Sequence, residues 1–400
     1  PSVTITAPAD GSTFTEGTSV GFSGTASDAE DGDLSSSLSW SSDLDGAIGS
    51  GASFSTSTLS VGSHTVTASV TDSGGLGGSD SIGVTIEADT GQPGAIDWNA
   101  TGTVAYSNQD GSGSVTVEDG GATLALEGNR WRRTTDTYTI TPYTVVEVDF
   151  MSTSEGEIHG IGFDEDDTLT NDVRIFQLDG TQAWTSAHHH YDGEYTTPGV
   201  FKTYKIPVGA FYTGSGFRLV LVNDKDSGTL DNDSRFRNVR IYEETPTVAT
   251  IDFDTYGMTA YSNQDGSGSV AVEDSGATLF LTGNRWRRST GTYTLTPNTV
   301  VAFDYQSTVE GEIHGIGFDE DDTLTNDLRI FRFFGTQSWA SDIDWVRTYD
   351  AGDVGTFKTF VIPVGREYTG SGFRLVFVND NDAGTTNTGR FRNVRVYELD

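Results

Sequence analysis

The stretch "EGEIHGIGFDEDDTLTND" begins at Glu155 and returns without a single change at Glu310. A second pair of stretches keeps the same offset, because "LEGNRWRR" at Leu126 is matched by "LTGNRWRR" at Leu281. Matches of this length predict two copies of one unit. Each copy spans about 150 residues, which is the size of a domain and too long for a solenoid repeat.

The repeat fixes the organisation of the chain. We expect the first copy at residues 96–244 and the second at 251–400, and residues 1–89 form a third domain of a different kind. A linker at 90–95, within "EADTGQPGA", separates this first domain from the repeats.

Composition and patterning predict strands. Hydrophobic residues make up 34 % of the chain and glycine occurs 49 times, which is typical of short strands joined by turns. Segments such as "TVVEVDF" and "FRLVLVND" alternate apolar and polar residues, and we find no amphipathic helix. We therefore predict an all-β protein, with one immunoglobulin-like sandwich followed by two homologous jelly-roll β-sandwich domains.

Charge and cysteine content narrow the setting. A net charge of −35 and the lack of a basic stripe argue against a nucleic-acid partner, since like charges repel. There is no cysteine for a disulfide framework and no run of eighteen apolar residues for a membrane span. An extracellular setting that is rich in calcium fits best. The opening "PSVTITAP", without a leader, suggests a mature fragment of a larger protein.

The first domain resembles bacterial immunoglobulin-like domains of the polycystic-kidney-disease and cadherin-like type. The resemblance lies in "ITAPADGSTFTEGTSVGFSGTASDAEDGD" and "GSHTVTASVTDSGG". It implies a spacer in a secreted, multi-domain protein, with Trp40 in the core between two sheets.

The two repeats resemble the β-sandwich carbohydrate-binding modules of secreted bacterial polysaccharide-degrading enzymes. The stretches that carry the resemblance are "GNRWRR", "EGEIHGIGFDEDD", "GTQAW" with its twin "GTQSW", and "FRNVRIYE". It implies non-catalytic, calcium-dependent binding of polysaccharide by a secreted or cell-surface monomer. That monomer would be fused to a catalytic or anchoring domain in the full-length protein.

The arginine-rich motif leaves two interpretations open. In an extended strand Trp131 and Arg133 share one face, and Arg130 and Arg132 share the other. An outward Trp131 would stack on a sugar ring while the guanidinium groups grip carboxylate or sulfate, which favours an acidic (uronic or sulfated) polysaccharide. Alternatively, Trp131 fills the core and the arginines neutralise acidic loops.

A second set of candidate binding residues follows a strand in each copy. A glutamine there precedes a tryptophan by two positions and can hydrogen-bond sugar hydroxyls while the indole stacks. The next loop differs between the copies, and loops carry specificity. The predicted ligand-binding residues are Arg130, Trp131, Arg132, Arg133, Gln182, Trp184 and Tyr191 in the first copy, and Arg285, Trp286, Arg287, Arg288, Gln337, Trp339, Trp345 and Arg347 in the second.

Acidic clusters at strand ends predict bound Ca²⁺, because a hard divalent cation relieves the repulsion among crowded carboxylates. The alternative is a set of solvated acidic loops. The predicted metal ligands are Asp164, Asp166, Asp167, Asn223, Asp224 and Asp226 in the first copy, and Asp319, Asp321, Asp322, Asn379, Asp380 and Asp382 in the second.

The sequence does not predict an enzyme. No Asp or Glu is isolated in an apolar run where its pKa would rise enough for a glycosidase acid, and no nucleophile motif occurs. The competing function is that of a cell-surface adhesin fragment that binds protein partners, in which calcium only makes the domains rigid.

Overall fold

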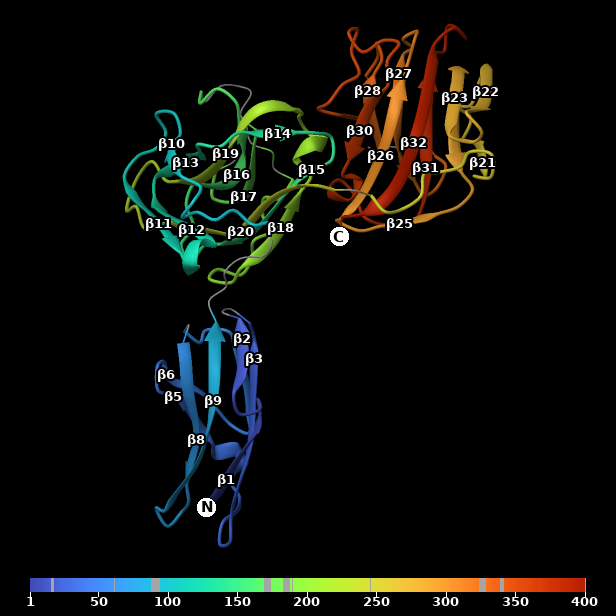
Figure 1. The fold of residues 1–400 in the computed structure, drawn as a ribbon. Helices are drawn as coiled ribbons and strands as arrows, with labels where there is room; N and C mark the ends of the chain where they lie inside the picture. The colour runs from blue at the N-terminus through green and yellow to red at the C-terminus, as the bar shows by residue number, and fades with distance from the viewer. Residues whose placement is uncertain are drawn as a thin grey trace. The chain divides into compact units, whose positions relative to one another are not determined.

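A computed structural model gives the fold of the chain (Figure 1). It describes residues 1–15, 18–60, 62–87, 94–168, 174–182, 188, 190–244, 246–323, 329–338 and 342–399. In this part of the chain the helical elements are short 3₁₀ turns, η1 (Ser35–Ser37), η2 (Asp119–Gly121), η3 (Val208–Ala210) and η4 (Val364–Arg366). None of these could cross a membrane. The predicted all-β class is confirmed.

The first domain is a sandwich of two sheets. One sheet has the order β1-β3-β4 with β7 beside β3, and the other has the order β2-β9-β8-β5-β6. Trp40 is buried between them with Phe22, as predicted. The strands are β1 (Ser2–Ala7), β2 (Ser12–Thr15), β3 (Val20–Asp28), β4 (Gly32–Asp33), β5 (Ser39–Ser42), β6 (Gly46–Ser50), β7 (Ser53–Thr56), β8 (Gly62–Thr71) and β9 (Gly77–Glu87).

Repeat 1 also contains two sheets. One has the order β10-β13-β19-β16-β17 with β14 beside β19, and the other has the order β11-β12-β20-β15-β18. The strands are β10 (Thr103–Ala105), β11 (Gly113–Glu118), β12 (Thr123–Gly128), β13 (Arg130–Thr134), β14 (Tyr138–Ile140), β15 (Thr144–Met151), β16 (Ile158–Asp164), β17 (Arg174–Asp179), β18 (Lys202–Ile206), β19 (Gly214–Asp224) and β20 (Asp233–Glu243).

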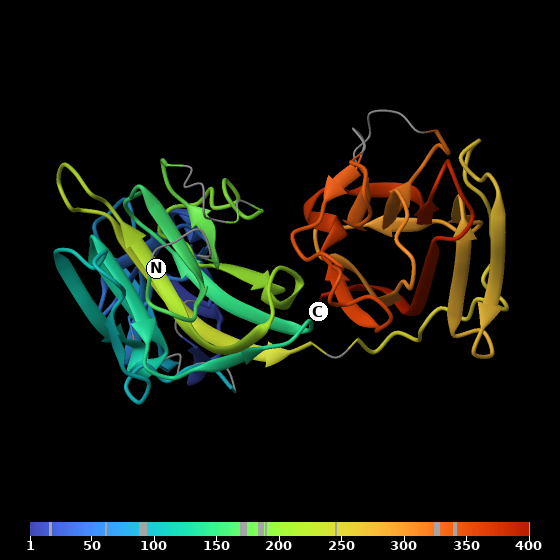
Figure 2. The ribbon, with the colours of Figure 1, turned by 90° about the horizontal axis from the view of Figure 1, so that it is seen from above.

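Repeat 2 has the same sheet orders, and its edge strand β29 pairs in parallel with β28; among the described residues of repeat 1, His188 forms a parallel bridge with Phe176 at the corresponding position. Figure 2 shows repeat 1 in cyan to yellow-green and repeat 2 in yellow to red. The strands are β21 (Met258–Ala260), β22 (Gly268–Glu273), β23 (Thr278–Gly283), β24 (Arg285–Ser289), β25 (Tyr293–Leu295), β26 (Thr299–Gln306), β27 (Ile313–Asp319), β28 (Ile330–Phe334), β29 (Asp342–Asp344), β30 (Lys358–Ile362), β31 (Gly370–Asp380) and β32 (Thr388–Glu398).

Each of these sheets takes its strands from only one of the three predicted segments. The exact domain boundaries stay predictions. Within repeat 1, residues 158–164 of the stretch that recurs unchanged in repeat 2 form β16, which lies between β17 and β19. Glycine is required at 162, because a Cβ there would lie 2.1 Å from the Arg174 carbonyl oxygen on β17. Gly317 meets Arg329 in the same way.

The sheets of the repeats are more deeply buried than simple alternation predicts. Every residue of β16 is buried, and β15 is buried at every position but its last. On β15 the buried acidic residues Glu147 and Asp149 pair with Arg240 and Arg237 of β20, at 2.5 and 3.5 Å. Side chains of neighbouring strands therefore cover the outer face of this sheet.

Candidate functional site

The tryptophan of the repeated motif lies inside each sandwich. Trp131 on β13 is 2 % exposed and stacks on Tyr106 with 6.0 Å between ring centroids. Trp286 on β24 is also 2 % exposed and stacks on Tyr261 at 5.9 Å. The predicted role of Trp131 and Trp286 as sugar platforms is therefore wrong, because a buried indole presents no face to a ligand.

The arginines of the motif are paired with carboxylates of the protein. Arg130 and Arg132, on one face of β13, both reach Asp110, at 3.3 and 2.8 Å. Arg133 pairs with Asp167 at 2.9 Å. Repeat 2 has the same ion pairs, between Arg285 or Arg287 and Asp265, and between Arg288 and Asp322. These ion pairs agree with the alternative interpretation, that the arginines neutralise acidic loops, and their predicted grip on an acidic glycan stays a prediction.

The buried indole instead holds an acidic cluster. The Trp131 Nε1–H donates to Asp224 Oδ1 at 2.7 Å. Carboxylate oxygens of Asp224, Glu157 and Asp226 lie within 4.8 Å of one another. Burial raises the pKa of Asp224 to about 6, and the charges of Asp226 and Glu157 act in the same direction. Repeat 2 forms the same cluster from Glu312, Asp380 and Asp382, with the Trp286 Nε1–H donating to Asp380 at 2.9 Å.

These clusters suit a hard divalent cation. Three carboxylates offer the oxygen donors that Ca²⁺ prefers, and their mutual repulsion is relieved by a cation. The sequence predicted Asp224, Asp226, Asp380 and Asp382 as metal ligands. It missed the glutamates at 157 and 312, whose signal was only that each lies two residues before the buried histidine of "EIHGIG".

The other predicted aspartate ligands have structural partners instead. Asp164 Oδ2 accepts from the Tyr106 hydroxyl at 3.1 Å and from the Asp167 N–H at 2.8 Å. Asp166 accepts from the Thr168 N–H at 2.9 Å. Asp319, Asp321 and Asp322 repeat this pattern. These side chains do not belong to either carboxylate cluster of the described residues, and the adjoining positions 169–173 and 324–328 lie outside that description.

The two predicted asparagine ligands are internal. The Asn223 Nδ2–H donates to the Gly128 carbonyl oxygen at 2.7 Å, and its Oδ1 accepts from the Ser234 hydroxyl at 2.9 Å. The Asn379 Nδ2–H donates to the Gly283 carbonyl oxygen at 2.7 Å. The prediction that Asn223 binds metal is wrong, because the residue is completely buried and both ends of its amide are hydrogen-bonded within the protein. Asn379 is equally buried, but its Oδ1 has no partner among the described residues, so its role as a metal ligand stays a prediction.

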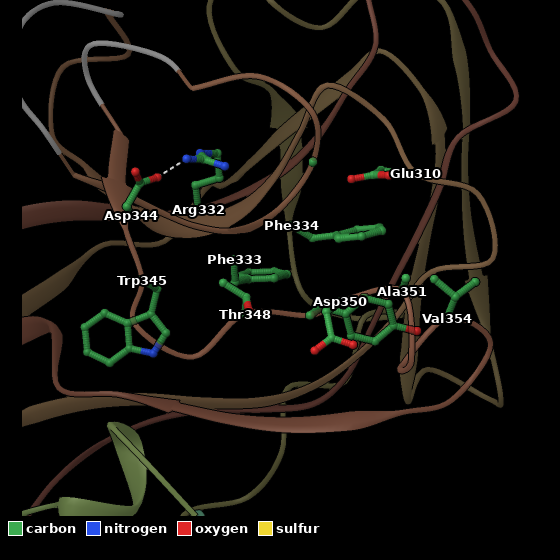
Figure 3. A pocket seen from close by; sticks show the side chains of 12 residues that line it. Glu310, Arg332, Phe333, Phe334, Asp344, Trp345, Thr348, Asp350, Ala351 and Val354 are labelled. Atoms are coloured by element: carbon green, nitrogen blue, oxygen red, sulfur yellow. Dashed lines mark hydrogen bonds and ion pairs between the residues drawn. The ribbon is translucent and has the colours of Figure 1, made fainter. Parts of the chain in front are cut away.

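Repeat 2 contains an open cleft with a volume of ≈ 530 Å³ (Figure 3). This volume lies in the range of about 300–1,000 Å³ that is typical of ligand sites. Aromatic side chains from β28 and the following loop line it together with acidic and polar ones. The lining residues are Glu310, Arg332, Phe333, Phe334, Gly335, Asp344, Trp345, Thr348, Tyr349, Asp350, Ala351 and Val354.

Two anchors give the cleft its shape. Arg332 on β28 pairs with Asp342 at 2.8 Å and also with Asp344, which fixes β29 as one wall. Figure 3 shows this Arg332–Asp344 pair on one side and Glu310 with Val354 on the other. The Tyr349 hydroxyl lies 3.1 Å from the carbonyl oxygen of Ser307 and so fixes the loop that follows β29.

Repeat 1 has a smaller cavity at the corresponding place, with a volume of ≈ 170 Å³. Its lining residues are Ser152, Thr153, Glu155, Asp179, Tyr195, Thr196 and Pro198. Glu155 corresponds to Glu310, because both open the identical stretch. Tyr195 corresponds to Tyr349, since its hydroxyl lies 3.0 Å from the carbonyl oxygen of Ser152.

The predicted binding residues of the variable loop lie in three different surroundings. Trp345 lines the cleft, whereas Arg347 packs over the Phe360 ring at 5.6 Å and is not among the lining residues. Tyr191 is interior, with its hydroxyl donating to the Lys205 carbonyl oxygen at 3.1 Å, so its predicted contact with sugar is wrong.

Gln182 and Gln337 are exposed and stay predictions. Trp184 and Trp339 lie outside the described residues. Sequence reasoning missed Glu310, Phe334 and Tyr349 as cleft residues; the signal for Phe334 was that the otherwise matching strand ends in "LDG" in one copy and in "FFG" in the other.

Comparison with known proteins supports the first domain most directly. Residues 1–68 match the family described as a bacterial Ig domain, which confirms the predicted resemblance of this segment. No curated protein matches the chain.

Solved structures that match the chain include carbohydrate-binding modules. A structure of carbohydrate-binding modules of the β-sandwich superfamily is 12 % identical over 60 % of this chain and 96 % of its own, with a TM-score of 0.21. SGBP-B from a complex xyloglucan utilization locus in Bacteroides uniformis is 11 % identical over 99 % of this chain and 98 % of its own, with a TM-score of 0.26. SGBP-B of Bacteroides ovatus, in complex with a mixed-linkage heptasaccharide, is 9 % identical over 97 % and 98 %, with a TM-score of 0.19.

Proposed function

We propose that the repeats bind polysaccharide without catalysis and that the cleft of repeat 2 holds the sugar. The observation that supports this is the combination of aromatic rings with hydrogen-bonding groups in one open cleft of suitable volume. Sugar rings offer apolar C–H faces to aromatic side chains and hydroxyl groups to carboxylates. Phe334, which at 7 % exposed is the least buried of the aromatic rings in the cleft, supplies apolar surface, and the exposed Glu310 and Asp350 supply the acceptors.

We propose that this cleft contains no catalytic acid. A glycosidase acid must stay protonated near neutral pH, which requires a carboxyl group in apolar surroundings. Glu310 and Asp350 are exposed to solvent, and Asp344 is exposed and paired with Arg332. A search for reducing ends released from a bound polymer checks this part of the proposal.

A second part of the proposal concerns the charge of the polysaccharide. Three carboxylates and one arginine line the cleft, and the arginine is already paired. This balance favours a neutral, hydroxyl-rich chain. Binding of an acidic chain, as predicted from the RWRR motif, now lacks its free arginines and would need another source of positive charge.

Affinity electrophoresis of the full chain through gels that contain either xylan or alginate tests both parts. We expect xylan to slow migration more than alginate does. Glu310→Ala should weaken the retardation by about tenfold in apparent Kd, since a charge-assisted hydrogen bond contributes about 1.5 kcal/mol. Glu30→Ala in the first domain is the control and should leave it unchanged. Retardation by alginate alone would restore the acidic ligand, and retardation by no polysaccharide would contradict the proposed function.

We also propose that Ca²⁺ stabilises each repeat at its carboxylate cluster. Glu157, Asp224 and Asp226 would hold the ion in repeat 1, and Glu312, Asp380 and Asp382 in repeat 2. Binding to the folded state alone stabilises it by about 2.7 kcal/mol when the ion is at a hundred times its Kd. The ion would neutralise the cluster that the buried tryptophan holds in place.

Calorimetry of the full chain with and without EDTA tests the calcium site. We expect EDTA to lower the melting transitions of both repeats. Asp226→Asn should remove the response of repeat 1, whereas Asp166→Asn, a carboxylate outside the cluster, should keep it. Equal melting with and without EDTA would contradict the site.

We further propose that the chain acts as a monomer outside the cell, where polysaccharide is found, joined to a catalytic or anchoring domain. Sedimentation of the full chain with and without xylan would reveal self-association if the monomer is the wrong assignment.

A further inference from the structure

The two clefts share most of one wall and differ at one strand position. Phe334 pairs across the sheet with His314, and Asp179 pairs with His159, so the two side chains occupy the same register position. The glutamate and tyrosine of the wall are the same in both repeats. A phenyl ring in repeat 2 thus replaces a carboxylate in repeat 1.

Phe334 is a supported aromatic surface. Its ring stacks on the His314 ring with 5.1 Å between centroids and 27° between planes, and it meets the Tyr349 ring edge-on at 5.1 Å. It is 7 % exposed, and Figure 3 shows it in the middle of the cleft, near Glu310. Because two neighbouring rings hold it, the small part of Phe334 that reaches the cleft can contact a ligand without loss of side-chain freedom.

Asp179 gives the other cleft a different chemistry. It lies in a cavity of ≈ 170 Å³, below the volume typical of ligand sites. Burial, followed by the charge of Glu155, raises its pKa to about 6. A sugar ring placed against this pair of carboxylates would have to desolvate them, which costs free energy unless every oxygen finds a donor.

We infer that position 334 determines which repeat holds a sugar ring: Phe334 makes the cleft of repeat 2 the sugar-binding one, and Asp179 closes the corresponding cavity of repeat 1 to a ring. The inference rests on the proposed function, and it adds the residue that sets the specificity. In repeat 2 Asp344 of β29 lines one wall of the cleft, and Phe334 contributes apolar surface to it.

Affinity electrophoresis of the full chain in xylan tests the inference. Phe334→Asp, which copies repeat 1, should raise the apparent Kd about tenfold or more, because it removes a stacking surface and adds a carboxylate. Phe334→Tyr keeps the ring and should bind within about twofold of the unmodified chain. Asp179→Asn should leave binding unchanged.

A second measurement covers the case in which Phe334→Asp unfolds repeat 2. Hydrogen exchange of the unmodified full chain should show that xylan protects residues 329–338 and leaves residues 174–182 unprotected. Equal protection of both segments, or Phe334→Asp that melts normally and binds normally, would overturn the inference while the proposed function stands. A chain that binds no polysaccharide would overturn both.

Discussion

Repeats 1 and 2 have the same contacts at the conspicuous RWRR motif, and their clefts differ at positions that no motif marks. The RWRR motif has the same partners in both copies, with Trp131 on Asp224 and Trp286 on Asp380. The clefts, by contrast, differ in volume by about threefold. The comparison teaches that the conspicuous motif builds the sandwich, and that the two clefts differ at less conspicuous positions.

A second difference lies in the core, around the histidine of "EIHGIG". In repeat 1 the Gly156 N–H donates to His159 Nε2 at 2.6 Å. The other ring nitrogen, Nδ1, therefore carries the proton and donates to the Ser234 hydroxyl at 2.7 Å, which in turn donates to Asn223 Oδ1 at 2.9 Å. Burial lowers the pKa of His159 to about 4, so the ring is neutral.

Repeat 2 replaces the serine by Gly389 and the neighbouring Phe150 by Tyr305. A Cβ at Gly389 would lie 2.8 Å from Asn379 Oδ1 and 3.4 Å from the Tyr305 hydroxyl, so the phenol fills the space of the serine side chain. His314 Nδ1, Asn379 Oδ1 and the Tyr305 hydroxyl are buried there without a partner among the described residues. A bridging water molecule would satisfy all three.

The largest effect on stability should come from the hydrogen bond between a buried tryptophan and a buried aspartate, which both repeats contain. Trp131→Phe removes the N–H that binds a buried carboxylate, and we expect it to lower the free energy of unfolding of repeat 1 by about 3 kcal/mol at pH 7. Trp286→Phe should have the same effect on repeat 2. Calorimetry of the full chain in EDTA measures both transitions.

Asp224→Asn provides the matched control for this prediction. In its presence Trp131→Phe should cost less, because no buried charge is then left unpaired. An additive double variant would show that only the volume of the indole matters. Unequal effects of the two tryptophan substitutions would contradict an equal role of this hydrogen bond in the two repeats.

The fold was predictable from the sequence and the site only in part. The repeat and the strand pattern predicted two homologous sandwiches, since long identical stretches and alternation reflect sheet geometry. The face of Trp131 was not predictable, because alternation assigns residues to opposite faces without saying which is buried. The partners of the arginines, Asp110 and Asp167, come from distant loops, so spacing along the chain could not reveal them.

The cleft was missed for a related reason. Glu310, Phe334 and Tyr349 come from three separate segments and meet only through sheet pairing and the return of a loop. Nothing in the local sequence of any of them signals a ligand site. Comparison of the copies at equal positions was the signal that the chain offered, since Asp179 and Phe334 end otherwise similar strands.

The next largest effect on stability should differ between the cores of the two repeats. Ser234→Ala leaves His159 Nδ1 and Asn223 Oδ1 unpaired, and we expect a loss of about 2 kcal/mol in the free energy of unfolding of repeat 1. Tyr305→Phe in repeat 2 should cost about 1 kcal/mol, because a water molecule can still join the two remaining groups.

Thermal melting of the full chain measures both core variants. A crystal structure of the protein should show an ordered water between His314, Asn379 and Tyr305. Equal losses of stability in the two variants, or the lack of this water in the crystal, would contradict the proposed difference between the two cores. Gly389→Ser is a useful companion, since the clash with Asn379 should make it more harmful than Tyr305→Phe.

The smallest effect concerns pH and belongs to repeat 1 alone. Asp179 has a pKa of about 6 in the folded protein against the ordinary value of 3.8, because of burial and the nearby charge of Glu155. The folded state therefore holds this proton more tightly than the unfolded state does, so the contribution of Asp179 to stability rises as pH falls from about 7 to 4. For a fully buried group the difference would amount to roughly 3 kcal/mol, and solvent screening of this half-buried one reduces it to about 1 kcal/mol.

Asp179→Asn tests this argument, because the amide mimics the protonated acid at every pH. The variant should be more stable than the unmodified chain by about 1 kcal/mol at pH 7, and the two should converge near pH 4. Other titrating groups, including the carboxylate cluster at Asp224, cancel in the difference between the two proteins. Repeat 2 has Phe334 at this position, so its melting transition should be the same in both proteins at each pH. A difference in stability that stays constant from pH 7 to 4 would show that the pKa of Asp179 is the same in the folded and unfolded states. The electrostatic difference between the cavity of repeat 1 and the cleft of repeat 2 would then be contradicted.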